Sequence, residues 1–368
     1  MRRDNGAFFE FIKSGLWERR CRLTVIKDVD FTEVYRVAQE QSVLGLVLAG
    51  LEHSEVKPSQ GDLLQWIGEV QLLEQRNKAM NGFVFKLQEL LKANGIEMVL
   101  MKGQGIAQCY ERPLWRACGD VDLLLDMTNF GKAEKYLRSM ASFVSKENPY
   151  TKHIAMTIKS WEVEIHGTLR SDLSRRIDGC LDEVAKDVFS GHSRKWDNNG
   201  ADVNLMSPDN DVVYVFTHIL QHFFRGGIGL RQICDWCRLL WTYRSHYDLN
   251  LLESRLRSIR LMSEWKAFGA LAVEYLGMPA EAMPLYSQSE KWTHKASRIL
   301  DIILETGNFG HNKDKSYYEK YPYVIYKSIS LWRNTKESLR HAMIFPMDSI
   351  RVWGRMINKG ISAVVNVK

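Results

Sequence analysis

Apolar residues recur at helical spacing in the first part of the chain. Within residues 62–94 they return every three or four positions, the spacing that places them on one face of an α-helix. Asn94 and Gly95 follow, and both residue types commonly end a helix. Shorter stretches of the same kind occupy residues 1–60. The pattern therefore predicts an N-terminal helical region over residues 1–94.

The pattern changes at Ile96. Residues 96–101 form a compact apolar run between Gly95 and Lys102, which is typical of a short buried strand. Similar runs and alternations predict strands at 121–126, 153–159, 161–167 and 203–206, with helices at 104–112 and 129–140. We therefore expect a small mixed sheet with helices over residues 95–206.

Helical periodicity returns after Pro208. It predicts helices at 211–224, 230–243, 249–259, 261–277 and 289–305. The tail from residue 316 is aromatic and basic and has a less regular pattern. A C-terminal helical domain is expected over residues 207–368. The fold class is thus α+β, with a small mixed-sheet core flanked by N-terminal and C-terminal helical regions.

The size and composition fit a packed globular protein. A chain of 368 residues is long enough for two or three domains. Hydrophobic residues make up 45% of the chain and charged residues 26%, which gives no sign of disorder. The formal net charge of +6 is a mild excess. It suits an anionic ligand but does not require a nucleic acid.

The chain lacks the marks of a secreted or membrane-spanning protein. Its six cysteines are ordinary usage for this length and do not form the dense pattern of a disulfide scaffold. Asp4 and Glu10 interrupt the stretch in which a secretion signal needs an apolar run. The longest apolar run, residues 43–51, is far shorter than the roughly 20 residues of a membrane span. We expect a cytoplasmic protein.

Two aspartates begin the strand expected at 121–126. Residues two apart in a strand point to the same face, so Asp120 and Asp122 are expected to project together. Two neighbouring carboxylates repel each other unless a cation lies between them, and Mg²⁺ prefers oxygen ligands of this kind. Gly119, just before the pair, permits a close backbone approach. The spacing predicts part of a magnesium site.

Two further segments supply complementary chemistry. Glu164 and His166 are also two apart in an expected strand, so they share one face. If that strand lies beside the aspartate strand, Glu164 completes a cluster of three carboxylates. Lys102 and Gly103 follow the first expected strand and precede an expected helix. A glycine turn at a helix start presents N–H groups to phosphate, and the lysine adds positive charge.

The order of these segments resembles that of nucleotidyltransferases of the DNA polymerase beta superfamily, and more narrowly an uncharacterised bacterial nucleotidyltransferase family. The resemblance covers roughly residues 62–245. It rests on Gly95-Ile96, Lys102-Gly103, Arg116, Asp120-Val121-Asp122-Leu123-Leu124 and Glu164-Ile165-His166, and in the helical part on His218, His222, Leu230-Arg231 and Asp235. One departure concerns the phosphate contacts, because Gln104 follows Gly103 where classical members have serine.

The resemblance implies transfer of a nucleoside monophosphate from an NTP, with ATP the expected donor, to an acceptor hydroxyl. Asp120, Asp122 and Glu164 are then the magnesium ligands and catalytic residues, and bound Mg²⁺ stabilises the attacking and leaving oxygens. Glu164 is also the candidate to accept the hydroxyl proton. Residues expected to contact or support the nucleotide are Lys102, Gly103, Arg116 and His166.

Plainer interpretations stand beside each of these. Asp-x-Asp is often a solvated strand end, and a lone Glu164 is often a surface residue. His166 is more often a structural partner than a ligand. Arg116 is equally consistent with an ion pair to a nearby acid. Asp235 is expected to pair with Arg231, four residues earlier on one helix.

Two motifs in the C-terminal helices invite stronger interpretations than they support. His218 and His222 share one helix face, but the glutamate of an H-E-x-x-H zinc motif is absent, so we expect a packed or hydrogen-bonded pair facing the cleft. Cys234 and Cys237 match C-x-x-C within an amphipathic helix, which favours buried thiols over redox chemistry or zinc.

The basic, partly apolar stretch of Arg351, Trp353, Arg355, Met356 and Lys359 could meet a membrane surface or nucleic acid. Packing on the helical domain explains it more simply.

Four functional hypotheses remain. The first is the Mg²⁺-dependent nucleotidyltransferase. The second is a nucleotide-binding or regulatory module that keeps the fold with little or no turnover, which the Gly103-Gln104 pair permits. The third is an interaction protein in which the helical regions matter most. The fourth is nucleotide addition to an RNA end, which the mild charge does not favour. The acceptor remains open among a small molecule, a protein and an RNA end.

Overall fold

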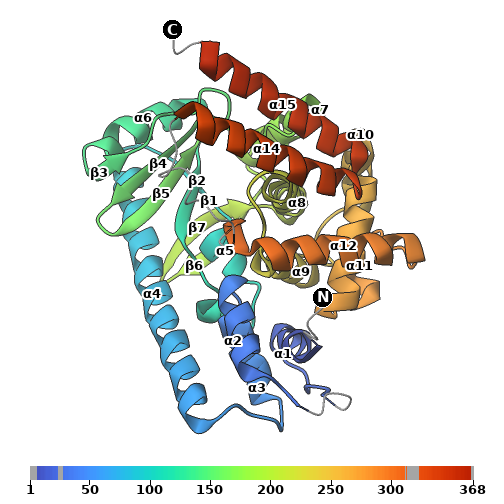
Figure 1. The fold of residues 1–368 in the computed structure, drawn as a ribbon. Coiled ribbons are helices and arrows are strands. Elements are labelled where there is room, and N and C mark those ends of the chain that lie inside the picture. The colour runs from blue at the N-terminus through green and yellow to red at the C-terminus, as the bar shows by residue number, and fades with distance from the viewer. Residues whose placement is uncertain (1–5, 24–27, 311, 313–322, 366–368) are drawn as a thin grey trace.

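The computed structural model describes residues 6–23, 28–310, 312 and 323–365. A single seven-stranded sheet lies between helices on both of its faces, and further helices extend from it (Figure 1). The fold is therefore α+β with flanking helices, as the sequence predicts.

The N-terminal region consists of helices, as expected. They are α1 (Gly6–Trp17), α2 (Phe31–Glu40), α3 (Leu44–Glu52) and α4 (Gln60–Ala93). Helices α1 and α3 approach closely, and a Cβ atom at Gly50 would lie 1.9 Å from the carbonyl oxygen of Phe11. The Ser59 hydroxyl caps α4 by accepting a hydrogen bond from the Asp62 N–H.

The sheet combines parallel and antiparallel strands. Its strands are β1 (Val99–Met101), β2 (Asp120–Leu124), β3 (Ala141–Val144), β4 (His153–Ile158), β5 (Trp161–His166), β6 (Ser193–Asn198) and β7 (Ala201–Met206). They lie in the order β3-β4-β5-β2-β1-β7-β6. The pairs β2–β5 and β1–β7 are parallel, and the other neighbours are antiparallel.

The sequence pattern did not predict two of the strands. β3 and β6 are the outermost strands of the sheet, and most of their side chains are exposed or only half-buried. An edge strand of this kind carries little apolar alternation for a pattern to reveal.

The two faces of the sheet are covered by different helices (Figure 1). One face packs against the second half of α4 and against α6 (Met127–Arg138), and its core includes Val121, Leu123, Val163 and Ile165. Alternation in the strands turns the intervening residues of β2 and β5 to the opposite face. That opposite face looks toward the C-terminal helices, and the polar residues of the predicted site lie on it.

The remaining helices of the sheet region are shorter or less regular in sequence. The helix expected at 104–112 is only α5 (Gly103–Ala107), followed by the 3-10 turn η1 (Pro113–Trp115). Helix α7 (Arg175–Phe189) was not predicted, although it has an apolar stripe of Ile177, Leu181, Val184 and Val188.

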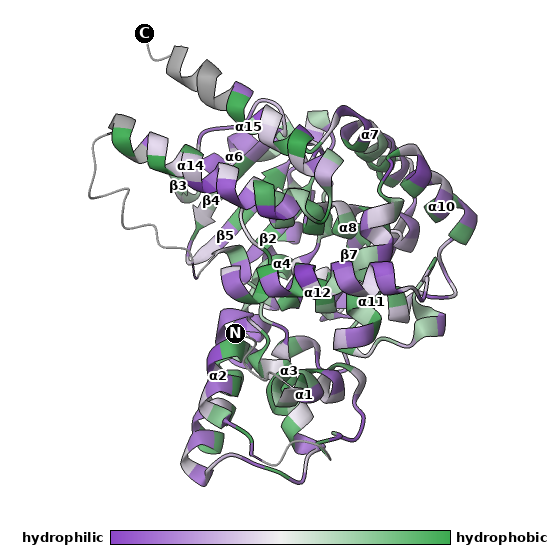
Figure 2. Ribbon diagram, turned by 45° about the vertical axis from the view of Figure 1, so that its right-hand side comes forward, coloured by the Kyte–Doolittle hydropathy of each residue, from purple (hydrophilic) through white to green (hydrophobic). Residues whose placement is uncertain are grey.

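The C-terminal region is helical, as the sequence predicts. It contains α8 (Pro208–Arg225), α9 (Leu230–Thr242), α10 (Leu249–Ser258), α11 (Met262–Leu276), η2 (Ala280–Ala282), α12 (Glu290–Thr306), η3 (Asn308–Gly310), α14 (Tyr323–Ala342) and α15 (Pro346–Val365). Hydrophobic and hydrophilic residues are interspersed along α12 and α14, as expected of helices at the surface (Figure 2). Among the described residues, each helix is too short or too polar to cross a bilayer.

One apolar core joins the N-terminal and C-terminal helices. It extends from Phe8 and Phe11 in α1 through Phe216 and Trp236 to Phe345, just before α15. The division at 94/95 and 206/207 remains a sequence prediction, because this core unites regions that the division separates.

Candidate active site

Three carboxylates converge on the face of the sheet that looks toward the C-terminal helices. Strands β2 and β5 are parallel neighbours, and Asp122 lies directly opposite Glu164 in their register. Asp120 is two residues earlier on the same face of β2. One oxygen from each of the three side chains lies within 4.8 Å of the others. The sequence placed each pair of residues on one face, and the strand register brings the two pairs together.

Lys102 supplies the positive charge nearest to this cluster. It follows β1, and its Nζ lies 2.9 Å from Oδ1 of Asp122, whose side chain is 2% exposed. The backbone of Lys102 has φ 50°, which is uncommon for a residue other than glycine, and Gly103 continues with φ 37°. This turn aims the lysine at the carboxylates.

The charges perturb one another strongly. The negative charge of Asp122, followed by burial, raises the pKa of Asp120. Burial opposes ionisation of Asp122 as well, but Lys102 and His166 outweigh it and lower the pKa of Asp122. Burial likewise opposes the charge of Lys102, yet Asp122, Tyr214, Asp120 and Glu164 together raise its pKa. The charge of Asp122 is therefore compensated by Lys102 and His166, whereas the charge of Asp120 is opposed by the neighbouring Asp122.

Two histidines lie beside the carboxylates. His166 Nε2 is 3.0 Å from Asp122 Oδ1 and 3.6 Å from Glu164 Oε2. His153, on the neighbouring strand β4, places its Nε2 3.0 Å from the same Glu164 oxygen. Burial opposes ionisation of Glu164, but the nearby His153 and His166 outweigh it and leave the pKa of Glu164 far below the usual range. The sequence analysis identified His166 but not His153.

Helix α8 faces this cluster with three residues spaced four apart. They are Tyr214, His218 and His222, and the two imidazoles approach through their Nε2 atoms at 3.1 Å. The predicted hydrogen-bonded histidine pair is thus confirmed. Burial and the charge of Lys102 lower the pKa of His222 to about 4, so both imidazoles are neutral at pH 7. Burial raises the pKa of Tyr214 to about 12, so it remains a phenol.

The chain matches the model of a known protein family. The model of a family described as uncharacterised nucleotidyltransferase matches residues 27–277, which include every strand of the sheet. The chain belongs to this nucleotidyltransferase family. Membership assigns it a general role in nucleotidyl transfer and a nucleotide as substrate. No curated protein matches the chain, and neither does any solved structure.

Gln104 stands where classical nucleotidyltransferases have serine, and its side chain faces the interior. It is 3% exposed, its Oε1 accepts from the Cys118 thiol, and its Nε2 is 3.5 Å from the Asn77 carbonyl oxygen. Helix α5 is only five residues long, so the expected anion site at a helix start is reduced to the turn itself. Lys102 is therefore the main positive group on this side of the carboxylates.

Arg116 lies in a buried ion pair instead of facing the carboxylates. Its guanidinium donates two hydrogen bonds to Asp235, from Nε at 3.0 Å and from Nη2 at 2.5 Å. The Tyr110 hydroxyl donates to the same carboxylate. The predicted pair between Arg231 and Asp235 is wrong, because Arg116 occupies Asp235 and Arg231 donates to the Ala117 carbonyl oxygen. The nucleotide-binding role expected of Arg116 stays untested, and nothing in its surroundings supports it.

Arg231 is better placed than Arg116 to meet an anion. Its charge partly opposes the rise in the pKa of Asp120 that Asp122 and burial cause, and its Nε is buried without a hydrogen-bond partner. The guanidinium carbon lies 5.6 Å from the centre of the Phe309 ring. Burial and the nearby Arg116 lower the pKa of Arg231, which is the response of a cation that lacks sufficient negative charge around it.

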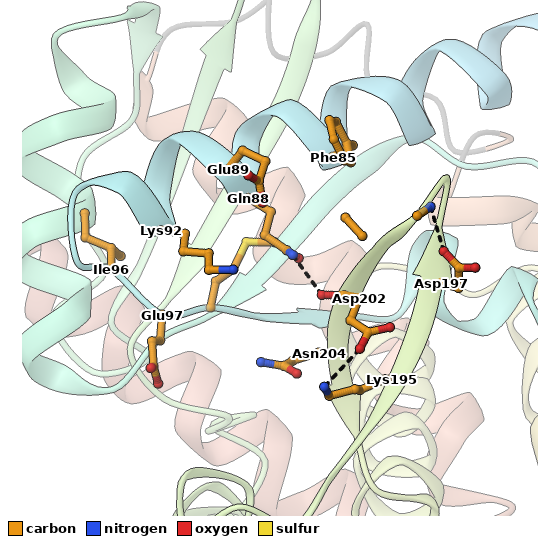
Figure 3. Close-up of a pocket in the computed structure, with 13 residues that line it drawn as sticks. Phe85, Gln88, Glu89, Lys92, Ile96, Glu97, Lys195, Asp197, Asp202 and Asn204 are labelled. Carbon is orange, nitrogen blue, oxygen red and sulfur yellow. Dashed lines mark hydrogen bonds and ion pairs between the residues drawn. The ribbon is translucent and has the colours of Figure 1, made fainter.

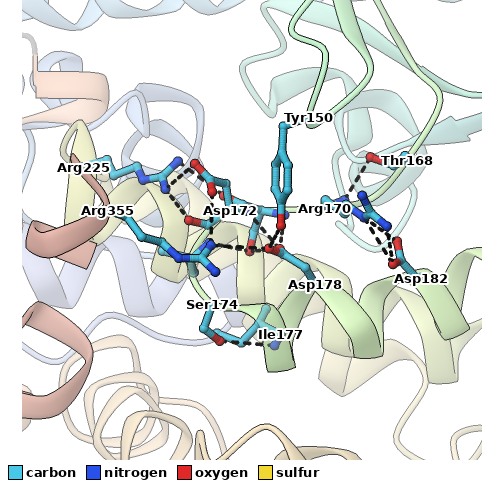
Figure 4. Close-up of polar contacts among 12 residues, drawn as sticks. Tyr150, Thr168, Arg170, Asp172, Ser174, Ile177, Asp178, Asp182, Arg225 and Arg355 are labelled. Atoms are coloured by element: carbon cyan, nitrogen blue, oxygen red, sulfur yellow. Dashed lines mark hydrogen bonds and ion pairs between the residues drawn. The ribbon is translucent and has the colours of Figure 1, made fainter. Parts of the chain in front are cut away.

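The loop after β5 is tied to two C-terminal helices (Figure 4). Asp178 Oδ1 accepts from the N–H groups of Ser171 and Asp172. Asp172 in turn contacts Arg225 of α8 at 3.0 Å and Arg355 of α15 at 3.1 Å. Arg355, which the sequence offered as part of a membrane or nucleic-acid surface, thus contacts this loop of the sheet region, and not the helical domain as the simpler interpretation expects. Lys359 lies outside the residues whose side chains are described.

Two other features carry no chemistry of their own. Cys234 and Cys237 are fully buried, and burial raises both thiol pKa values, so the interpretation as buried thiols is confirmed.

A pocket of about 780 Å³ lies between α4 and the β6–β7 hairpin (Figure 3). Its lining is polar and contains residues such as Lys92, Lys195 and Asp202, but none of the clustered carboxylates.

Proposed function

We propose that this protein transfers a nucleoside monophosphate from an NTP to an acceptor hydroxyl in a Mg²⁺-dependent reaction, with ATP as the first donor to test. The observation that carries the proposal is the in-register pair of Asp122 and Glu164 with Asp120 beside them. Three carboxylates in such proximity are a donor set for a hard divalent cation. The raised pKa of Asp120 reflects the repulsion from the neighbouring Asp122, which a bound cation would relieve.

Asp120, Asp122 and Glu164 are the residues that hold Mg²⁺ in this proposal. When bound, the ion neutralises charge on the phosphates and on the reacting oxygens. Lys102 binds phosphate oxygens from the β1 side, and Arg231, with its unpaired Nε, binds them from α9. In this proposal Glu164 is also the group that accepts the proton of the acceptor hydroxyl. The neutral imidazoles of His218 and His222 border the site without adding charge.

The deciding experiment measures nucleotide binding and turnover separately. The melting temperature is recorded with each of the four NTPs, with and without Mg²⁺, for the wild type and for Asp120→Asn/Asp122→Asn. A ligand at one hundred times its Kd stabilises by about 2.7 kcal/mol. We expect a Mg²⁺-dependent rise with at least one NTP that the double variant loses. Pyrophosphate release with pooled acceptors then measures transfer.

A matched control removes two carboxylates from the pocket in Figure 3. Glu97 and Asp202 are both exposed and lie outside the cluster. The Glu97→Gln/Asp202→Asn variant changes the net charge equally and should keep the full NTP effect. If no NTP stabilises the wild type, the proposal fails.

The alternative is a nucleotide-binding or regulatory module with the same fold. The interior position of Gln104 favours it, because the phosphate contact of the classical serine is absent at this position. It predicts the Mg²⁺-dependent rise in melting temperature without pyrophosphate release for any acceptor.

A further inference from the structure

Three potential metal ligands converge beside the carboxylate cluster. His153 from β4 and Glu164 and His166 from β5 each offer one atom, and these atoms lie within 4.8 Å of one another. The two strands are neighbours (Figure 1), and in their antiparallel register His153 pairs with His166. The ring centres of these two imidazoles are 4.8 Å apart.

Both imidazoles lie close to the same oxygen atom, Oε2 of Glu164. His153 Nε2 is 3.0 Å from Glu164 Oε2, and His166 Nε2 is 3.6 Å from it. A tetrahedral ion with bonds of 2.0–2.1 Å holds its ligand atoms about 3.3 Å apart. The two measured separations lie on either side of that value. Two of the three separations are thus close to the spacing that a tetrahedral ion requires.

Hydrogen bonding alone leaves part of this arrangement unexplained. Nε2 of His153 is shielded from solvent and makes no well-aligned hydrogen bond, despite its short distance to Glu164. His166 Nε2 lies close to both Asp122 and Glu164. A buried polar atom without a well-aligned hydrogen bond is unfavourable, and a cation among the three atoms would satisfy it.

The donor set differs from that of the three carboxylates. Two imidazoles and one carboxylate suit zinc and related first-row ions, whereas Mg²⁺ prefers oxygen ligands only. Catalytic zinc sites also use three protein ligands and leave a position open.

We propose that His153, Glu164 and His166 form a second metal site for an ion of the Zn²⁺ type, which shares Glu164 with the carboxylate cluster. This site does not depend on nucleotide binding. It places a transition metal at the border between β4 and β5 and leaves Asp120 and Asp122 to the harder cation.

The test titrates metal-free protein with Zn²⁺ by calorimetry and with Co²⁺ by visible absorption, without nucleotide. We expect one Zn²⁺ per chain and the visible bands of tetrahedral Co²⁺. His153→Ala should weaken Zn²⁺ binding at least tenfold and abolish these bands. Asp120→Asn should retain them. His192→Ala removes an exposed histidine outside the site and should also leave binding unchanged.

Either of two results overturns the site: Co²⁺ without visible bands in the wild type, or His153→Ala with unchanged Zn²⁺ affinity. Since a ligand variant can misfold, the melting temperature of the wild type with and without Zn²⁺ provides a second measurement. The absence of a Zn²⁺-dependent rise would also overturn the proposed site. The Mg²⁺–NTP experiment tests the proposed transferase independently. A wild-type protein that binds Zn²⁺ but is not stabilised by any NTP would reject only the proposed transferase. A wild-type protein that is stabilised by Mg²⁺–NTP but does not bind Zn²⁺ would reject only this site.

Discussion

The Lys102 ammonium lies 2.9 Å from the Asp122 carboxylate, and their side chains are only 15% and 2% exposed. Lys102 thus compensates the most deeply buried charge of the site before any ligand arrives. A phosphate that binds Lys102 must share it with Asp122, which links nucleotide binding to the charge balance of the carboxylates.

Replacing this lysine should destabilise the fold. Lys102→Met leaves Asp122 buried with His166 as its remaining partner, and removal of one member of a buried ion pair costs about 3 kcal/mol. Urea unfolding measures the loss, and Mg²⁺ should restore part of it by taking over the compensating role. Lys132→Met, on the exposed side of α6, is the control. Equal stability of the two variants would contradict this account.

The buried pair of Arg116 and Asp235 gives a second prediction. Arg116→Gln and Asp235→Asn should each cost about 3–5 kcal/mol, because each leaves the other charge unpaired. The double variant should cost less than the sum of the two, which a double-mutant cycle in urea measures. It should also keep the Mg²⁺-dependent NTP effect. Loss of that effect in a folded double variant would restore the phosphate role expected of Arg116.

Glu264 should make the protein less stable as the pH rises. It is 3% exposed, and burial followed by the charge of Asp348 raises its pKa to about 8 from 4.5. The folded state therefore binds more protons than the unfolded state between these values. The stability from this group is complete below pH 4.5 and is lost as the pH rises to 8, by up to about 5 kcal/mol.

Glu264→Gln tests this directly, because it mimics the neutral form. The variant should match the wild type near pH 5 and exceed it in free energy of unfolding near pH 8. Denaturant unfolding at both pH values gives the difference. A difference between the two proteins that does not change with pH would rule out the titration of Glu264 as its source.

The fourth prediction concerns the loop after β5. Arg355→Gln removes the contacts of α15 with Asp172 and Asp178, while Arg225 still contacts Asp172 (Figure 4). Amide hydrogen exchange should become faster in residues 168–174 and stay unchanged in β2. Arg351→Gln, one turn earlier on α15, pairs with Asp348 instead and should leave the loop protected. Equal protection in both variants would mean that Arg355 does not hold the loop.

Local pattern was sufficient for much of the fold because helix and strand periodicities are local. The repeat in residues 62–94 predicted α4 almost to its ends, and the alternation in β2 and β5 placed Asp120 with Asp122 and Glu164 with His166. The edge strands β3 and β6 lacked such a repeat, since neither of their faces is continuously buried.

What the sequence determined by itself was which residues share a face, because the strand period of two is a property of the backbone. What only the tertiary structure decided was which faces meet. The register of β5 beside β2 places Glu164 opposite Asp122, and β4 places His153 next to Oε2 of Glu164. Arg116 pairs in the interior with Asp235, which is 119 residues away in the chain. These contacts join residues far apart in the chain, and they depend on how all the elements pack together.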